Sequence, residues 1–182
     1  MMAQHSGWQV RDSKYLFQSP WYSLRQDQLT LPNGQNITYT LIDHPGYVMV
    51  VPLLDDGRVM MERVYRYTLQ RTCLECPSGG ILKAETFEAA ARRELEEETG
   101  YRAAKLDLLG RFIGSPGISN EEYDLFLATQ LTADGVLQRE PTEEIALELI
   151  PLQTLTEMVY RGEISNGPSA LGILLVSRAV GV

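Results

Sequence analysis

The segment 79–101 gathers acidic side chains toward one end of an expected helix. It contains six glutamates, and Glu94, Glu97 and Glu98 follow one another at i, i+3 and i+4. On an α-helix this spacing places three carboxylates on one face within about one turn. The like charges repel one another, and the negative end of the helix macrodipole adds to the repulsion.

Two kinds of partner could relieve this repulsion. Arg92 and Arg93 lie in the same segment and could screen a solvated acidic face. A divalent cation such as Mg²⁺ or Mn²⁺ could also do so, because hard ions prefer carboxylate oxygens and can keep positions for water or substrate phosphates. The spacing alone does not choose between an acidic surface and a metal site.

The helix that carries these glutamates is predicted from apolar periodicity. Phe87, Ala90, Ala91 and Leu95 recur at helical spacing, so one face can pack inward. Gly100 stands where a C-cap residue is expected. We therefore predict a helix of about 13 residues.

The rest of the chain reads as strands followed by helices. Asn33-Gly34 and Asp56-Gly57 are two-residue turn signals, and each predicts a hairpin. The second has longer apolar runs and should be more deeply buried. Further strands are expected at 105–114, 122–131 and 146–152, and helices at about 152–160 and after Asn166-Gly167-Pro168.

Length and charge limit the class of protein. The 182 residues, 44% of them hydrophobic, suffice for one or at most two compact domains. We place a boundary near His44-Pro45-Gly46, between an N-terminal strand unit (1–45) and a mixed α/β body (46–182). No apolar run or leader pattern predicts membrane association, so a cytoplasmic location is expected. The net charge of −8 argues against binding nucleic acid, and an anionic substrate would need a neutralising partner.

Cys73 and Cys76 form a C-x-x-C pair, which could indicate zinc or redox chemistry. The sequence has no second such pair, and His5 and His44 lie far away along the chain. We therefore expect two buried strand thiols.

The segment 79–101 resembles the Nudix box, the loop-helix-loop signature of a family of diphosphate hydrolases. The match runs from Gly79 through five residues to Glu85, and then through seven residues to the run 93–101. Tyr101 departs from the family's usual smaller aliphatic residue, at a packing position. The resemblance implies an α/β (α+β) fold with a mixed β-sheet sandwiched between α-helices, and it favours the metal site over the solvated face.

The same resemblance implies roles for individual residues. The expected metal ligands for Mg²⁺, or alternatively Mn²⁺, are Glu94, Glu97, Glu98 and the backbone carbonyl of Ser78. Arg93 would hold the glutamates in place, and Glu85 would orient the helix. Bound cations would screen the charge of a diphosphate, stabilise the leaving phosphate and lower the pKa of an attacking water.

A general base is expected outside the box. The stretch REPTEEI before the last predicted strand resembles the catalytic loop of ADP-ribose pyrophosphatases and offers Glu140, Glu143 and Glu144. We favour Glu143 as base or additional metal ligand, with Glu140 next. The alternative for each is a solvated loop carboxylate.

Substrate residues are implied by resemblance to the ADP-ribose pyrophosphatase branch, which extends over most of 46–182. Pro116, fifteen residues beyond Tyr101, resembles the marker of that branch. Arg66 corresponds to an arginine that contacts the substrate phosphates or nucleotide. The pocket beside the terminal ribose or sugar would be lined by Ser115, Pro116, Gly117 and Glu121, whose alternative role is a simple turn.

The stretch 19–35 resembles the small N-terminal antiparallel sheet through which such enzymes form homodimers. Trp21, with Tyr22 beside it, would stack on the nucleobase in the partner's site, and stacking suits any base. Its alternative role is an interface or core aromatic. The arginine that some members carry in the following strand is not evident in 36–43.

We therefore expect a metal-dependent hydrolase of nucleoside diphosphate sugars, with ADP-ribose as the leading substrate and AMP and ribose 5-phosphate as products. A pyrophosphatase for GDP-mannose or ADP-glucose is the rival within the enzyme class. A catalytically inactive nucleotide-sugar-binding module is the rival outside it, and the intact set Glu94, Glu97 and Glu98 argues against that reading.

Overall fold

The computed structural model describes residues 7–139 and 144–182, which divide into two compact units. The N-terminal unit contains the chain up to Gly46 together with Ile113–Glu122. The main unit contains Tyr47–Phe112 and Tyr123–Val182. A segment distant in sequence therefore belongs with the N-terminal strands.

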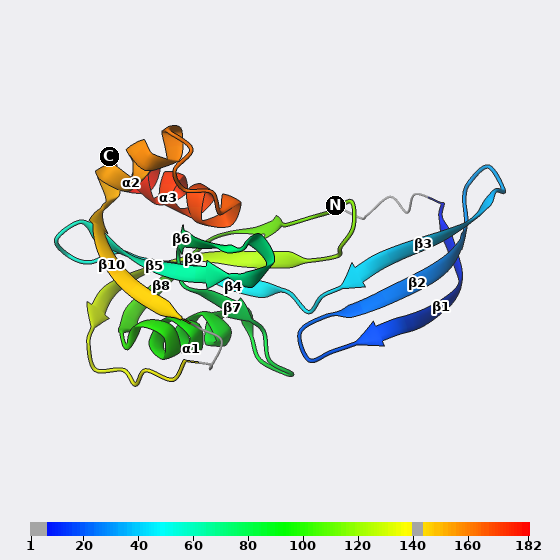
Figure 1. Cartoon of the computed structure of the whole chain (residues 1–182), viewed down its shortest axis with the longest axis horizontal. Coiled ribbons are helices and arrows are strands. Elements are labelled where there is room, and N and C mark those ends of the chain that lie inside the picture. The colour runs from blue at the N-terminus through cyan, green and yellow to red at the C-terminus, as the bar shows by residue number, and fades with distance from the viewer. Residues whose placement is uncertain (1–6, 140–143) are drawn as a thin grey trace. The chain divides into compact units, whose positions relative to one another are not determined.

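The N-terminal unit is built on a three-stranded antiparallel sheet in the order β1-β2-β3 (Figure 1). Its strands are β1 (Gln9–Gln18), β2 (Ser23–Thr30) and β3 (Asn36–Asp43). Every residue of β1 is exposed. The predicted β2–β3 hairpin is confirmed, but its two-residue turn was wrong. Residues 31–35 join the two strands. Their turn is not type I′, because a type I′ turn needs a positive φ at both Asn33 and Gly34, and only Gly34 has one (83°).

The described residues of the main unit form two sheets. Its strands are β4 (Tyr47–Pro52), β5 (Arg58–Arg66), β6 (Arg71–Glu75), β7 (Ser78–Gly80), β8 (Arg102–Ile113), β9 (Glu122–Thr132) and β10 (Ile145–Pro151), with a short 3₁₀ turn at Tyr67–Leu69. The last residue of β8 and the first of β9 belong to the N-terminal unit. One sheet has the order β7-β4-β9-β8 and is mixed, since β4 runs parallel to β9 and antiparallel to β7. The other, β10-β5-β6, is antiparallel.

The second predicted hairpin has its turn at Asp56-Gly57 as expected, but it is wrong in turn type and in pairing. Gly57 takes a positive φ (82°) and Asp56 does not, the Leu54 N–H donates to the Arg58 carbonyl (2.9 Å), and a bridge joins Leu53 to Val59. Beyond that bridge β4 and β5 enter different sheets. The deep burial expected of these strands is confirmed.

Helices cover both faces of the mixed sheet, as expected for this fold (Figure 1). The helices are α1 (Phe87–Thr99), α2 (Leu152–Tyr160) and α3 (Gly167–Val180). The strand β4 shows the layering through its period of two: Val48 and Val50 pack with the buried face of α1, while Met49 and Val51 pack in the core that includes α2 and α3. The predicted 13-residue helix coincides with α1.

Within the described ranges, no helix is long and apolar enough to cross a membrane. Cys73 lies in β6 and Cys76 just beyond it, and both are buried free thiols, as expected apart from the second lying past the strand end. Burial raises the pKa of Cys76 to about 12, so its thiol stays protonated at neutral pH.

Candidate active site

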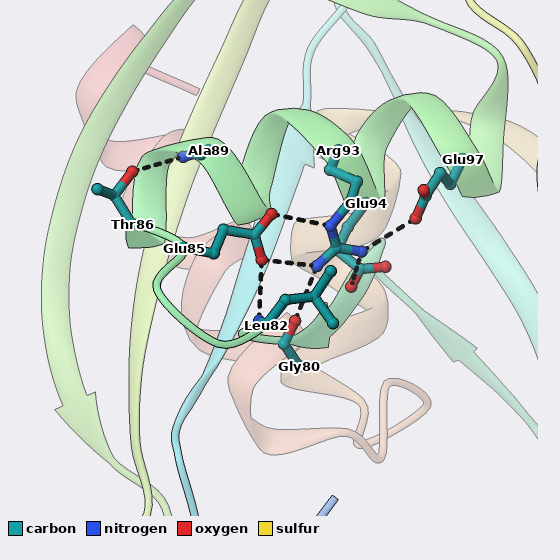
Figure 2. Close-up of polar contacts among 8 residues, drawn as sticks. All are labelled: Gly80, Leu82, Glu85, Thr86, Ala89, Arg93, Glu94 and Glu97. Carbon is teal, nitrogen blue, oxygen red and sulfur yellow. Dashed lines mark hydrogen bonds and ion pairs between the residues drawn. The ribbon is translucent and has the colours of Figure 1, made fainter. Parts of the chain in front are cut away.

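The ends of α1 are fixed by local capping. The side chain of Thr86 accepts a hydrogen bond from the Ala89 N–H (3.2 Å), which caps the amino end (Figure 2). Gly100 takes a left-handed conformation (φ 75°), and its N–H donates to the Glu96 carbonyl (2.8 Å). The helix thus ends directly after the glutamate cluster.

Arg93 is the centre of the polar network on α1 (Figure 2). Its Nη1 donates to Glu94 Oε1 (2.7 Å) and to Glu97 Oε2 (3.0 Å). Its Nε and Nη2 donate to the two carboxylate oxygens of Glu85 (2.9 and 3.0 Å), and Nη2 also donates to the Gly80 carbonyl (2.9 Å). The bonds to Glu85 are the main reason that the pKa of Arg93 is raised above its ordinary value. One guanidinium therefore orients two of the expected metal ligands.

Glu98 is held by the strand that precedes the box. Its Oε2 accepts a hydrogen bond from the Ser78 N–H (2.9 Å), and the residue is 5% exposed. Ser78 is the first residue of β7, so its backbone is fixed by pairing with Met49 of β4. This contact brings the third glutamate to the residue whose carbonyl is the expected fourth ligand.

Gly79 is required by the position of Glu94. A Cβ atom on Gly79 would lie 2.0 Å from Cδ and from Oε1 of Glu94, far inside contact distance. Glu94 is 8% exposed, so its carboxylate lies directly against this backbone. Gly80, the next residue, has room for a side chain, since among the described residues no atom of a non-neighbouring residue lies within 4 Å of a Cβ placed there.

The donor set fits a hard divalent cation, because it consists of carboxylates and a carbonyl. Among the described residues, however, no three acidic, histidine or cysteine side chains are gathered closely enough to form a ready-made cage. Glu94 and Glu97 are turned to Arg93, and Glu98 is turned to Ser78. Arg93 bridges the carboxylates of Glu94 and Glu97, while helical spacing keeps all three glutamates on one face.

Glu85 should make a pH-dependent contribution to stability. Its bonds to Arg93 hold the pKa of Glu85 below its ordinary value, against the opposing effect of burial. The resulting stabilisation is therefore complete above the unfolded pKa of about 4.3 and is lost as the pH falls through the lower folded pKa. We expect Glu85→Gln to reduce the free energy of unfolding by about 1 to 3 kcal/mol at pH 7. The reduction should shrink below about pH 4 in urea titrations.

Glu88→Gln is the matched control on the same helix. Glu88 pairs with Arg92 (3.0 Å), but its side chain is 61% exposed. This variant should lose less than about 0.5 kcal/mol. Equal losses in the two variants at pH 7 would contradict a stabilising role for the Glu85–Arg93 contact.

Arg66 is engaged by a buried carboxylate. Its Nε and Nη2 donate to the two oxygens of Glu75 (3.2 and 2.8 Å), and these bonds raise the pKa of Arg66. Glu75 lies opposite Glu62 in the β5–β6 ladder, and the two are 3% and 1% exposed. Sequence reasoning missed both carboxylates, although a charged residue inside the apolar run VMMERV was an available signal.

The predicted sugar-pocket residues all lie in Ile113–Glu122, within the N-terminal unit: Ser115, Pro116, Gly117 and Glu121. The Tyr39 hydroxyl donates to the Gly117 carbonyl (3.0 Å). Asn120 donates to Asp43 (2.6 Å) and accepts from the His44 N–H (2.8 Å). The segment is therefore fastened to β3 and the residues that follow it.

Trp21 lies between β1 and β2 and is 64% exposed, so it is not a core aromatic. Tyr22 is 45% exposed, and its ring centroid lies 6.0 Å from that of Phe17. These side chains form an exposed aromatic group at one end of the N-terminal sheet.

The expected general bases Glu143 and Glu140 lie outside the described residues. Glu144 is described and exposed, directly before β10. The structure brings together Ser78, Glu85, Arg93, Glu94, Glu97 and Glu98 in the main unit. Arg66 is in the same unit, whereas the other expected substrate residues are in the N-terminal unit.

Comparison with protein families agrees with this geometry. Residues 43–168 match the NUDIX domain, and the chain therefore belongs to the Nudix hydrolases, enzymes that generally use divalent metal ions. Residues 8–42 match, in addition, the nucleoside diphosphate sugar hydrolase N-terminal domain.

Individual relatives point the same way. The chain is 35% identical to an ADP-ribose pyrophosphatase of Bacillus subtilis over 87% of this chain and 86% of that protein. It is 32% identical to an ADP-ribose pyrophosphatase of Mycobacterium tuberculosis over 96% of this chain and 85% of that protein. A crystal structure of an ADP compounds hydrolase shares the fold, with a TM-score of 0.82 at 21% identity over 96% of this chain and 94% of that one.

Proposed function

We propose that this Nudix hydrolase cleaves the diphosphate bond of ADP-ribose, giving AMP and ribose 5-phosphate, with Mg²⁺ as its metal. The observation that carries the catalytic part is the complete glutamate set of α1, oriented by Arg93 and Ser78. The choice of ADP-ribose is supported by the two pyrophosphatase relatives and by the N-terminal domain match.

Each part of the main unit then has a task. Glu94, Glu97, Glu98 and the Ser78 carbonyl would hold the metal, which supplies charge neutralisation and a more acidic attacking water. Arg93 keeps Glu94 and Glu97 aligned on one face of α1. Glu143, with Glu140 as second choice, takes the proton of the attacking water.

Arg66 binds the substrate diphosphate in this proposal. Glu75 accepts from its Nε and Nη2, and the Arg66 side chain is 43% exposed. A guanidinium carries five N–H donors, so those not directed at Glu75 can meet phosphate oxygens. The buried carboxylate thus fixes the direction in which Arg66 points.

The N-terminal unit supplies recognition and assembly in this proposal. Trp21 stacks on the base, while Ser115, Pro116, Gly117 and Glu121 contact the sugar.

Homodimerisation through the N-terminal strands is supported by β1, an edge strand with Val10, Leu16 and Phe17 exposed. Sedimentation equilibrium should give twice the chain mass, and a monomer at micromolar concentration would contradict the dimer. The proposed location is the cytoplasm, which fractionation of the source cells would test.

A substrate panel tests the activity. ADP-ribose, GDP-mannose, ADP-glucose, NADH, diadenosine polyphosphates and nucleoside triphosphates are each incubated with Mg²⁺ or Mn²⁺ and a phosphomonoesterase, and released phosphate is measured. ADP-ribose should give the largest kcat/KM. A larger value for GDP-mannose or ADP-glucose would replace the substrate and keep the chemistry, consistent with the absence of arginine from 36–43. No release with either metal would favour a binding module.

A further inference from the structure

Arg139 connects the carboxyl end of α1 to the first residue of β10. Its Nε and Nη2 both donate to the carbonyl oxygen of Glu98 (2.9 and 2.6 Å). Its Nη1 donates to the carbonyl oxygen of Ile145 (2.8 Å). One half-buried guanidinium therefore contacts the backbone of two residues. These are Glu98, an expected metal ligand, and Ile145 of β10, which lies 47 positions later in the sequence.

Arg139 completes a set of contacts along the end of the helix. The last carbonyls of an α-helix have no partner within the helix and need one elsewhere. Here the carbonyl of Glu96 accepts from the Gly100 N–H (2.8 Å), that of Glu97 from the Gln138 N–H (2.9 Å), and that of Glu98 from Arg139. Three consecutive carbonyls are thus held, two of them by residues 138 and 139.

Residues 135–139 lie close against the carboxyl end of α1. The Gly135 N–H donates to the Gly100 carbonyl (3.0 Å), and a Cβ on Gly135 would lie 2.9 Å from that same oxygen. The Val136 N–H donates to the Glu96 carboxylate (3.2 Å). Residues 135–139 therefore run along the end of α1 and place Arg139 at its last turn.

The charge of Arg139 suits this place. The carboxyl end of a helix carries partial negative charge and is stabilised by cations. Although α1, all of which is described, carries glutamates in its last turn, it has no basic residue there. Arg139 supplies from outside the helix the positive charge that the last turn lacks.

From these contacts we propose that Arg139 is a positioning residue of the active site. It fixes the backbone at Glu98 relative to β10, and so sets the direction in which the Glu98 carboxylate leaves the helix. This inference rests on the proposed role of Glu98 as a metal ligand. The expected bases Glu140 and Glu143 lie in the sequence between the two anchored points, outside the described residues.

If Arg139 only stabilised the fold, its loss would lower stability without changing metal binding. The distinguishing measurement is Mn²⁺ binding to the whole protein without substrate, followed by the electron paramagnetic resonance signal of free Mn²⁺. The variants are Arg139→Met, Arg139→Lys and the control Arg102→Met. Arg102 lies at the same helix end and pairs with the Glu96 carboxylate (2.6 Å) rather than with a helix carbonyl.

Arg139→Met should weaken Mn²⁺ binding by about 10- to 100-fold, the range typical of partners that orient metal ligands. Arg102→Met, with the same loss of charge, should bind Mn²⁺ as the wild type does. Arg139→Lys keeps the positive charge but lacks the planar guanidinium group that contacts the carbonyls of both Glu98 and Ile145. Its Mn²⁺ binding should therefore also be weakened. If Arg139→Met does not fold, as judged by circular dichroism, the comparison of Arg139→Lys with wild type decides.

The proposal is overturned if the Arg139 variants match Arg102→Met or wild type in Mn²⁺ affinity, if lysine restores full affinity, or if the wild type binds no Mn²⁺. Failure of the proposed function would be seen in the substrate panel instead. A protein that cleaves no sugar nucleotide can still show the difference in Mn²⁺ affinity between the Arg139 variants and wild type. With the substrate found by the panel, Arg139→Lys should lower kcat by a larger factor than it raises KM.

Discussion

Replacing Glu98 by glutamine is expected to reduce kcat by more than about 100-fold, since even partners that only orient metal ligands cost about 10- to 100-fold. Glutamine has the same shape and can still accept the Ser78 N–H bond that Glu98 makes (2.9 Å). The substitution also removes a negative charge from the unfavourable end of a helix. The melting temperature should therefore stay level or rise while turnover collapses, as measured by calorimetry and steady-state kinetics.

Glu96→Gln is the control for this prediction. Glu96 belongs to the same acidic run, but its carboxylate pairs with Arg102 (2.6 Å) and accepts from the Val136 N–H, away from the Arg93 network. That variant should retain turnover close to wild type. Near-normal turnover in Glu98→Gln, or equal losses in the two variants, would remove Glu98 from the metal ligands.

Introducing one methyl group at Gly79 should disable the enzyme by a different route. In Gly79→Ala the new Cβ would occupy the space of the Glu94 carboxylate, 2.0 Å from its Cδ. Glu94 must then move, and its bond to Arg93 must change (2.7 Å). We expect kcat/KM to fall about 100-fold, as a displacement of about 1 Å in a catalytic group can cause. The free energy of unfolding should fall by about 1 to 3 kcal/mol.

The neighbouring substitution Gly80→Ala adds the same methyl group one residue later. Among the described residues no atom lies within 4 Å of that position, and the backbone there does not take a left-handed conformation. Its activity should remain close to wild type, and its stability should change by less than about 1 kcal/mol. If both alanine variants keep full activity, the close approach of Glu94 to Gly79 does not matter for catalysis.

Much of α1 could be predicted from the sequence because its determinants are local. Apolar periodicity and Gly100 gave its limits, and helical spacing gave the shared face of Glu94, Glu97 and Glu98. The metal and substrate roles came from the family resemblance. They remain predictions for the individual residues, although the Nudix family itself is shown.

The features that were missed depend on partners far along the chain. The turn at Gly57 is local and was predicted, but the pairing of β5 with β6 and β10 depends on residues up to Pro151. The contact of Arg139 with Glu98 spans 41 positions, and the loop 115–121 is fastened to β3 across more than 70. Periodicity carries no information on such pairings, since they are set by how the whole core packs.

The division of the chain into two units has a consequence for how such an enzyme can diverge. On the assignment proposed above, the groups that meet base and sugar lie in the N-terminal unit, while the glutamates and Arg93 lie in the main unit. The chain passes between the units after residues 46, 112 and 122. Selection for a new nucleotide sugar could therefore act on Trp21 and the 113–122 segment while the bond-breaking apparatus is inherited unchanged.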